Sequence, residues 1–220
     1  MPLLIILVII WIYYVYLNHP KYWSYQYDEL RSKFKTGDMI LFHGLDNINP
    51  IFIGTYYGHV GIVFVDPDEP NSRPKIFEAF NTSTMPFYPK KCSNGIVLAD
   101  LEHRLNSYRG YCFYKELEVP IDIDLQRNFV EFISYAQKNM FYNKNVIING
   151  VSKLLMNDCL GNATNCGELA YLSLIKLGVI PFSEIFANRK HHLLWLANTT
   201  SFPNNQYKKP IYVLANYLKV

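Results

Sequence analysis

The stretch from Thr164 to Gly178 constrains the fold most strongly, because its sequence is typical of a helix with a cysteine in the first turn. Asn165, or Thr164 before it, is a favoured N-cap residue, Glu168 three positions after Asn165 completes a capping-box pattern, and Gly178 is the residue type that often follows a helix. Leucine and isoleucine recur between these ends at helical spacing, which predicts a buried helix. We therefore expect Cys166 to be held rigidly where a helix begins.

A cysteine in this position has two interpretations. The unpaired N–H groups and the positive end of the helix dipole favour a thiolate, and the same N–H groups offer donors to an oxyanion, so Cys166 fits the position of a nucleophile. A small cysteine that is simply buried at a helix start is the commoner case. A base beside Cys166 would distinguish the two interpretations.

The composition indicates a globular domain. The chain has 220 residues, half of them hydrophobic, including 18 Tyr and 14 Phe, and this is enough to bury a core. Its 21 basic and 18 acidic residues are nearly balanced, and no basic run is interleaved with aromatic residues, so we expect no nucleic-acid partner. No glycine-rich phosphate loop or zinc-ligand spacing occurs, and we expect no metal and no cofactor. One disulfide is compatible with the four cysteines, which are Cys92, Cys112, Cys159 and Cys166.

The N-terminal segment 1–18 is apolar and uncharged, and its run from Leu3 to Leu17 is just long enough to span a bilayer. We interpret it as a single-pass transmembrane anchor, because it lacks the basic start and the small-residue cleavage site of a signal peptide. A buried core helix is the alternative. Basic residues after the run favour a cytoplasmic body, whereas sequons at Asn81, Asn162 and Asn198 favour the other side, so the orientation stays open.

We expect a connector over 19–35 and a single α+β domain over 36–220. Apolar patterns bounded by turn residues predict strands and one amphipathic helix; the strands are 39–42, 58–65, 75–80, 93–98, 111–119 and 211–214, and the helix is 126–140. Residues 100–108 fit a loop or a helical turn. The strands 58–65 and 75–80 flank a polar turn and therefore predict a hairpin.

The hairpin suggests a partner for a histidine. Symmetric pairing about its turn places His59 directly opposite Glu78 on one face of the sheet, where the carboxylate can orient the imidazole. An activated cysteine, a histidine and an orienting group are the minimum for thiol-based acyl transfer, and Cys166, His59 and Glu78 supply all three. On spacing alone, His59 competes with the other histidines, which are His19, His43, His103, His191 and His192.

The context of these residues resembles a known family. Gly37 to Phe42 is a strand led by Gly-Asp, Gly58 to Val63 is a strand that begins with His59, Glu78 follows on the next strand, and Asn165 to Leu169 opens the cysteine helix. This order resembles that of the circularly permuted papain-like hydrolases of the NlpC superfamily, which include the YiiX-like proteins with their poxviral relatives and the lecithin:retinol acyltransferase-like enzymes. The resemblance spans residues 36–178.

The resemblance implies Cys166 as nucleophile, His59 as general base and Glu78 as the orienting group, with Asn81 as an alternative to Glu78. It also implies a permuted papain-like fold, in which an antiparallel sheet or barrel packs against helices. The function implied is that of a thiol hydrolase or acyltransferase, which cleaves an amide or ester bond through a thioester, and the apolar N-terminal segment predicts that this enzyme is anchored in a membrane. Its partners would be the lipid bilayer and a peptide, isopeptide or lipid acyl substrate.

Two alternatives to an enzyme stay open. A membrane or virion structural protein can keep this fold without activity, because a fold does not secure a function. An anchored binding domain with a buried cysteine is the other alternative.

Overall fold

The computed structural model describes residues 24–44, 57–69, 71–80, 94–142, 163–180 and 211–214. The strands within them are β1 (Ser24–Gln26), β2 (Met39–Gly44), β3 (His59–Phe64), β4 (Lys75–Ala79), β5 (Ile96–Asp100), β6 (Gly110–Lys115), β7 (Phe141–Tyr142), β8 (Ala163–Thr164) and β9 (Ile211–Leu214). The helices within them are α2 (Tyr27–Leu30), α4 (Leu101–Ser107), α5 (Ile123–Asn139) and α7 (Cys166–Lys176), with a 3-10 turn at Arg31–Lys33.

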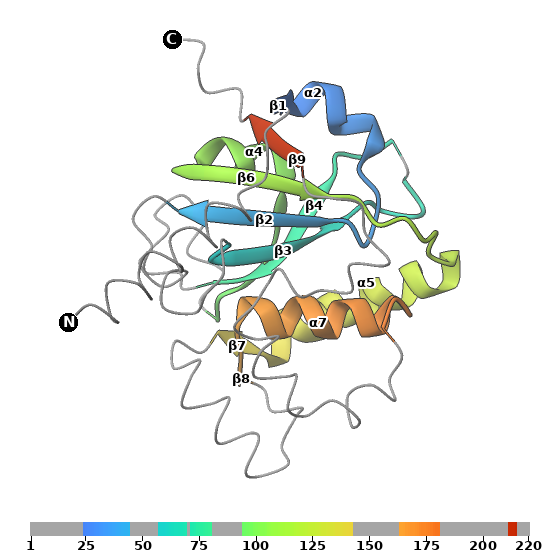
Figure 1. Ribbon diagram of the computed structural model, residues 1–220. Helices are drawn as coiled ribbons and strands as arrows, with labels where there is room; N and C mark the ends of the chain where they lie inside the picture. Colours follow the sequence, from blue (N-terminus) through green and yellow to red (C-terminus); the bar gives the residue numbers. More distant parts are fainter. Residues whose placement is uncertain are drawn as a thin grey trace, which may run out of the picture.

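Seven of these strands form one sheet in the order β1-β9-β6-β2-β3-β4-β5, and β7 and β8 form a separate parallel pair (Figure 1). Within the large sheet all neighbours are antiparallel except β1 and β9, which are parallel at one edge. Helices pack against this sheet, so the described part of the chain has the predicted α+β class with an antiparallel sheet.

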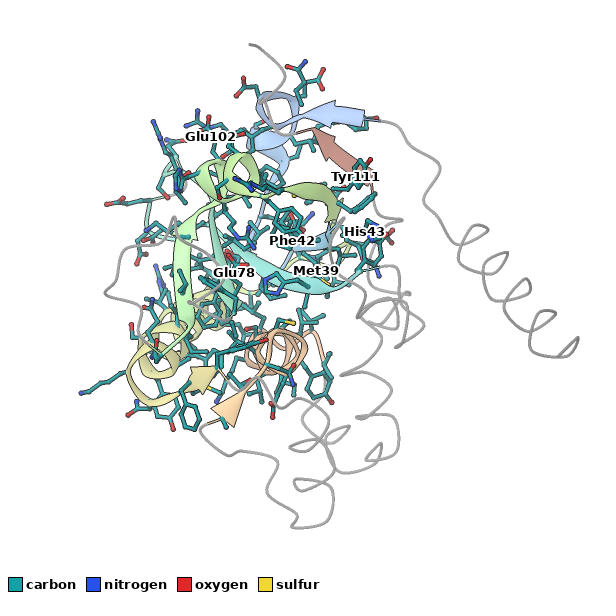
Figure 2. All side chains as sticks on the ribbon, turned by 90° about the vertical axis from the view of Figure 1, so that its left-hand side faces the viewer. Met39, Phe42, His43, Glu78, Glu102 and Tyr111 are labelled. Atoms are coloured by element: carbon teal, nitrogen blue, oxygen red, sulfur yellow. The ribbon has the colours of Figure 1, made fainter. Side chains whose placement is uncertain are left out.

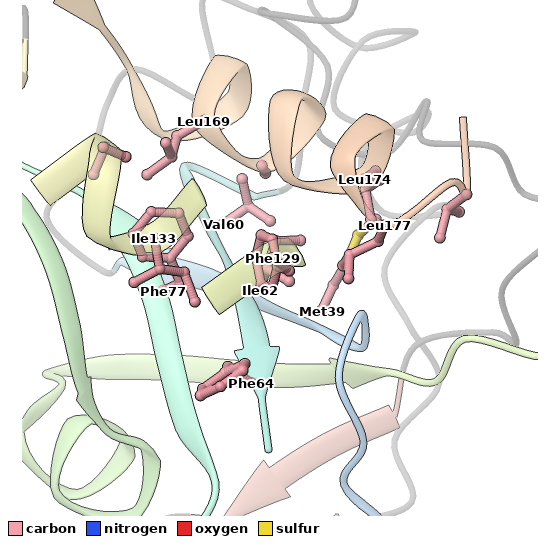
Figure 3. Packing of buried hydrophobic residues seen from close by; sticks show 14 of the residues in the cluster. Met39, Val60, Ile62, Phe64, Phe77, Phe129, Ile133, Leu169, Leu174 and Leu177 are labelled. Carbon is pink, nitrogen blue, oxygen red and sulfur yellow. The ribbon is translucent and has the colours of Figure 1, made fainter. Parts of the chain in front are cut away.

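One face of the sheet is covered by α5 and α7. Leu169 and Leu174 of α7 pack over Val60 and Ile62 of β3, and Phe129 of α5 completes the contact (Figure 3). All five side chains are at most 1% exposed. Because burial of a leucine, valine or phenylalanine contributes roughly 1.5–3 kcal/mol, this layer fixes α7 firmly on β3.

The opposite face is covered by α2 and α4. The next residues along the strands, Ile40 of β2 and Val63 of β3, belong to a second buried cluster with Leu101 and Leu105 of α4 and Tyr27 of α2. Alternation along a strand accounts for the two clusters, since successive side chains point to opposite faces. Both faces of the central strands are therefore buried.

The predicted strands and both predicted helices are present, with changes at their ends. Strand β6 ends at Lys115 and not at 119, because the Leu117 N–H donates to the Asp38 carboxylate at 2.8 Å and so leaves the ladder. The segment 100–108 contains a seven-residue helix, α4, whose N-cap Asp100 accepts a hydrogen bond from the His103 N–H at 2.8 Å. The pairing of β1 with β9 and the pair β7-β8 had no sequence signal.

The expected connector and anchor are only partly within the described residues. From 24 onward, the connector takes part in the domain: β1 is an edge strand, and Tyr27, Leu30 and Phe34 are buried in the second cluster. The apolar segment 1–18 lies outside the described residues. In the part of the chain that is described, no helix combines the length and the apolar character needed to cross a bilayer.

Candidate active site

Cys166 is the first residue of α7, as its sequence predicts. The N-cap Asn165 has an extended backbone, and its side-chain oxygen accepts a hydrogen bond from the Glu168 N–H at 3.0 Å. The predicted N-cap at Asn165 is therefore formed. It places the cysteine where the N–H groups of a first helical turn point outward.

The thiol of Cys166 is surrounded by groups that stabilise its ionised form. Burial alone would raise the pKa of the thiol, but the charge of His59, a hydrogen bond with its ring, and hydrogen bonds from the N–H groups of Val60 and Gly167 outweigh burial and lower the pKa. The lowered pKa favours a thiolate, which is the nucleophilic form of cysteine.

His59 lies between Cys166 and Glu78. As the first residue of β3, it is at the end of the sheet, where the start of α7 also lies. Its Nε2 is 2.6 Å from Oε2 of Glu78, so Nδ1 is the ring nitrogen that remains for Cys166. Burial alone would lower the pKa of His59, whereas the Cys166 thiolate and then the Glu78 carboxylate raise it above the usual value. The imidazolium form is thereby favoured together with the thiolate.

The position of Glu78 corrects one expectation. Strands β3 and β4 pair Ile62 with Phe77 and Val63 with Ile76, and continuation of this register sets Glu78 opposite Gly61. The prediction that His59 lies directly opposite Glu78 is wrong, although the shared face is right. The two side chains meet diagonally, which is within reach of long side chains. A shift of two residues keeps every side chain on its face, so the hydrophobic pattern does not distinguish these registers.

Arg104 was missed in the sequence. Its side chain is 1% exposed, its Nε donates to Oε1 of Glu78 at 2.6 Å, and its Nη2 donates to Oε2 at 3.2 Å. Burial alone would raise the pKa of Glu78, but the charges and hydrogen bonds of Arg104 and His59 lower it to about 2. A signal was present: Leu101, Arg104 and Leu105 have the spacing of one buried helix face, and an arginine on such a face requires a partner.

The other candidate residues are elsewhere. His43 stacks on Tyr111 with ring centroids 6.1 Å apart, and His103 is exposed on α4. Figure 2 shows Glu78 and Phe42 in the interior of the domain and His43 with Tyr111 toward its border. The remaining candidates lie outside the described residues: Asn81, His19, His191, His192, Cys92 and Cys159.

The two described cysteines, Cys112 and Cys166, are both free. Their environments differ, because burial raises the pKa of Cys112 to about 12 while the surroundings of Cys166 lower its pKa. Cys112 can therefore serve as an internal reference when the reactivity of Cys166 is measured.

The Gly-Asp pair at the start of β2 has a structural role. Gly37 has a φ of 94°, which favours glycine, and its N–H donates to the carbonyl of Val63. The fully buried Asp38 accepts hydrogen bonds from the N–H groups of Lys35 and Leu117 and from the hydroxyl of Tyr114. The pair ties a turn to β3 and to the end of β6.

Comparisons with known proteins add little to this geometry. No protein-family model and no curated protein matches the chain. Among solved structures, the chain is similar to the crystal structure of the metalloprotein YiiX from Escherichia coli O157:H7, DUF1105, with 12% identity, a TM-score of 0.43, and coverage of 80% of this chain and 87% of that one. Among the residues described for our protein, no group of three or more His, Cys, Asp or Glu side chains is arranged to hold a metal ion.

Proposed function

We propose that this protein is a cysteine hydrolase or acyltransferase of the permuted papain-like class, with Cys166 as nucleophile, His59 as general base and Glu78 as the orienting group. The observation that carries the proposal is the position of His59, whose ring bonds to the Cys166 thiol on one side and to Glu78 at 2.6 Å on the other. A nucleophile, a base and a group that orients the base are the parts required for acyl transfer through a thioester.

Before the reaction, the proton of Cys166 lies on Nδ1 of His59, so the site starts as a thiolate beside an imidazolium. The thiolate attacks the carbonyl carbon of an ester or amide, and a C–S bond forms while the carbonyl oxygen becomes an oxyanion. Backbone N–H groups at the start of α7 stabilise this oxyanion. The oxyanion collapses, the bond to the leaving group breaks, and the leaving group takes the proton from His59.

The second half regenerates the thiolate. Water or another acceptor attacks the thioester carbon while His59 removes its proton. The C–S bond breaks, the sulfur leaves as the thiolate, and the proton stays on His59 as in the resting site. Through both halves Glu78 accepts from Nε2 of His59, which fixes the imidazole tautomer and keeps Nδ1 directed at the sulfur.

The first test measures the reactivity of the thiol in the full-length protein. Iodoacetamide at pH 6 is expected to label Cys166 in preference to Cys112, because of these two described cysteines Cys166 has the lowered pKa and Cys112 the raised one. His59→Ala should slow labelling of Cys166, and Cys112→Ser is the matched control that should not. Preferential labelling of Cys112, or equal rates with and without His59, would exclude this site.

The second test asks for the covalent intermediate. The full-length protein is incubated with fluorogenic acyl esters and short peptide amides, and its mass is measured. We expect an acyl adduct on Cys166 that Cys166→Ser abolishes, and a loss of turnover of about 10²- to 10⁴-fold in His59→Ala, as for removal of a general base. A long-chain adduct favours the acyltransferase, and peptide cleavage favours the peptidase. An unreactive Cys166 with no adduct would overturn the proposal in favour of a non-enzymatic protein.

A further inference from the structure

We infer that Arg104 is a positioning residue of the proposed active site: it holds Glu78 as a carboxylate in the orientation that lets Oε2 accept from His59. This inference rests on the proposed function and extends the site from three side chains to four. It also gives a role to α4, which lies on the face of the sheet opposite to α7.

The geometry of the ion pair supports this role. Arg104 uses two nitrogens, with Nε at 2.6 Å from Oε1 and Nη2 at 3.2 Å from Oε2 of Glu78. A guanidinium that binds a carboxylate with two N–H groups fixes the plane of the carboxylate as well as its position. His59 meets the same Oε2 at 2.6 Å, so the arginine determines where that oxygen is presented.

Arg104 is itself held on several sides. Its guanidinium carbon lies 4.4 Å from the centroid of the Phe42 ring and 5.2 Å from that of Tyr108. The Phe42 ring also packs against His59, with centroids 5.2 Å apart. A single aromatic ring therefore contacts both groups that bind Glu78, and their spacing is fixed from the side as well as through the carboxylate.

The charges around Glu78 indicate what the arginine adds. Glu78 is faced by His59 from β3, Arg104 from α4, Cys112 from β6 and Tyr108 after α4. Burial raises the pKa of both Cys112 and Tyr108, so these two groups are neutral at physiological pH. Arg104 supplies a permanent positive charge.

This charge determines where the proton of the site resides. With Arg104 present, Glu78 stays ionised and the proton released by Cys166 remains on His59. Without Arg104, the burial of Glu78 is no longer offset by a permanent cation, and the carboxylate competes with His59 for the proton. The imidazolium that stabilises the thiolate would then be lost.

The experiment measures the rate of Cys166 alkylation between pH 4 and pH 10 in the full-length protein and its variants. In Arg104→Met we expect the acidic limb of the profile to move toward neutral pH, with a rate at pH 6 reduced about tenfold or more, since one unit of pKa changes the thiolate fraction about tenfold. Arg104→Lys keeps the charge but not the two-pronged contact, and should fall between Arg104→Met and the wild type. Arg127→Met is the matched control, because Arg127 is a 54% exposed arginine that pairs with Asp68; its profile should equal that of the wild type.

A double-mutant cycle separates positioning from a general structural effect. If Arg104 acts through Glu78, adding Arg104→Met to Glu78→Gln should leave the profile of Glu78→Gln unchanged. The double variant also removes both buried charges, so it folds more readily than Arg104→Met alone. The ¹⁵N resonances of His59 give a second measure, since tautomer and protonation change its ring nitrogens. In the wild type we expect a protonated Nε2 that donates to Glu78. In Arg104→Lys we expect a mixture of protonation states at the two ring nitrogens.

The outcomes distinguish this inference from the proposed function. If wild-type Cys166 reacts no faster at pH 6 than an ordinary thiol, the proposed function fails and the inference fails with it. If wild-type Cys166 reacts rapidly at pH 6 and Arg104→Met reacts equally, only the role of Arg104 is overturned. A full additional loss when Arg104→Met is combined with Glu78→Gln would also overturn it.

Discussion

Among the described residues, two carboxylates are fully buried, Asp38 just before β2 and Glu78 in β4, and their surroundings have opposite effects on their pKa values. Both are at most 1% exposed. Asp38 accepts from two backbone N–H groups and the hydroxyl of Tyr114, and its nearest ammonium, on a half-exposed Lys35, is 3.9 Å away. Burial outweighs these donors and raises the pKa of Asp38 to about 6. At Glu78, burial acts in the same direction, but Arg104 and His59 lower the pKa to about 2.

The comparison teaches that burial alone does not decide the charge of a carboxylate: burial prevails over the neutral donors of Asp38, whereas the positively charged partners of Glu78 prevail over burial. With neutral donors, Asp38 keeps a raised pKa of about 6, and its hydrogen bonds connect a turn to neighbouring strands. A guanidinium and an imidazole keep Glu78 ionised, and an ionised carboxylate is what a catalytic histidine requires. Of the motifs that suggested a family, the Gly-Asp pair therefore has a structural role, and Glu78 is part of the proposed site.

The largest expected difference between the two carboxylates is in stability, when each is replaced by the amide of the same shape. Glu78→Gln removes the carboxylate whose charge offsets that of the buried Arg104 guanidinium, and it should reduce the free energy of unfolding by about 3–5 kcal/mol at pH 7. Asp38→Asn replaces one acceptor by a donor but removes a poorly solvated charge, so its cost should stay below about 2 kcal/mol. Urea unfolding of the two variants measures both values.

The same pair should differ in reactivity. Glu78→Gln is expected to slow alkylation of Cys166 at pH 6, whereas Asp38→Asn is expected to leave the rate at the wild-type value, because Asp38 does not contact His59 or Cys166. Equal losses of stability, or a slower thiol in Asp38→Asn, would contradict the assignment of one carboxylate to the site and the other to the fold.

A smaller effect is expected in the pH dependence of stability. A carboxyl with a raised folded-state pKa adds stability that is full below its unfolded value and is lost as the pH rises through the folded value; for Asp38 this window runs from 3.8 to about 6. A carboxyl with a lowered pKa adds stability that is present above its unfolded value and is lost as the pH falls; for Glu78 this window runs from 4.5 down to about 2.

The two variants should therefore separate on acidification. Between pH 6 and pH 4 the wild type should gain up to about 3 kcal/mol relative to Asp38→Asn, from a shift of about two units at 1.36 kcal/mol each. Over this range its advantage over Glu78→Gln should be nearly constant, and it should shrink only below pH 4.5. Unfolding curves at pH 7, 6, 5 and 4 test this, and parallel behaviour of the two variants would refute it.

The sequence predicted those parts of the molecule that depend on local pattern. The cap of α7, the strands β2 to β4 and the shared face of His59 and Glu78 follow from residue type and periodicity. The diagonal offset of His59 from Glu78 does not, because a two-residue shift preserves the faces. Arg104 stands on a helical face whose partner strand is 26 residues away in the chain, so its role depends on tertiary packing. The pairing of β1 with β9 is non-local in the same sense.

The smallest expected effect comes from a pair of glycines, one beside each carboxylate. Gly37 precedes Asp38, and a Cβ on it would lie 2.6 Å from Cδ1 of Ile121 in a backbone with a φ of 94°. A Cβ on Gly61 would lie 2.5 Å from Cδ1 of Ile76 and 3.3 Å from Cβ of Glu78. Each contact requires neighbours to move, and each alanine substitution should cost about 1–2 kcal/mol.

The two glycine variants are expected to lose similar amounts of stability. They therefore test whether the alkylation rate of Cys166 depends on the local packing around Glu78 or only on the stability of the whole domain. In Gly61→Ala the new Cβ pushes against the side chains of Ile76 and Glu78. Because Glu78 orients His59, alkylation of Cys166 at pH 6 should slow in proportion to the shift of Glu78. Gly37→Ala strains the turn that holds Asp38, at a distance from the thiol, so its alkylation rate should equal that of the wild type. Equal slowing in both variants would mean that the reactivity of Cys166 follows global stability, and the distinction between a carboxylate of the fold and a carboxylate of the site would fail.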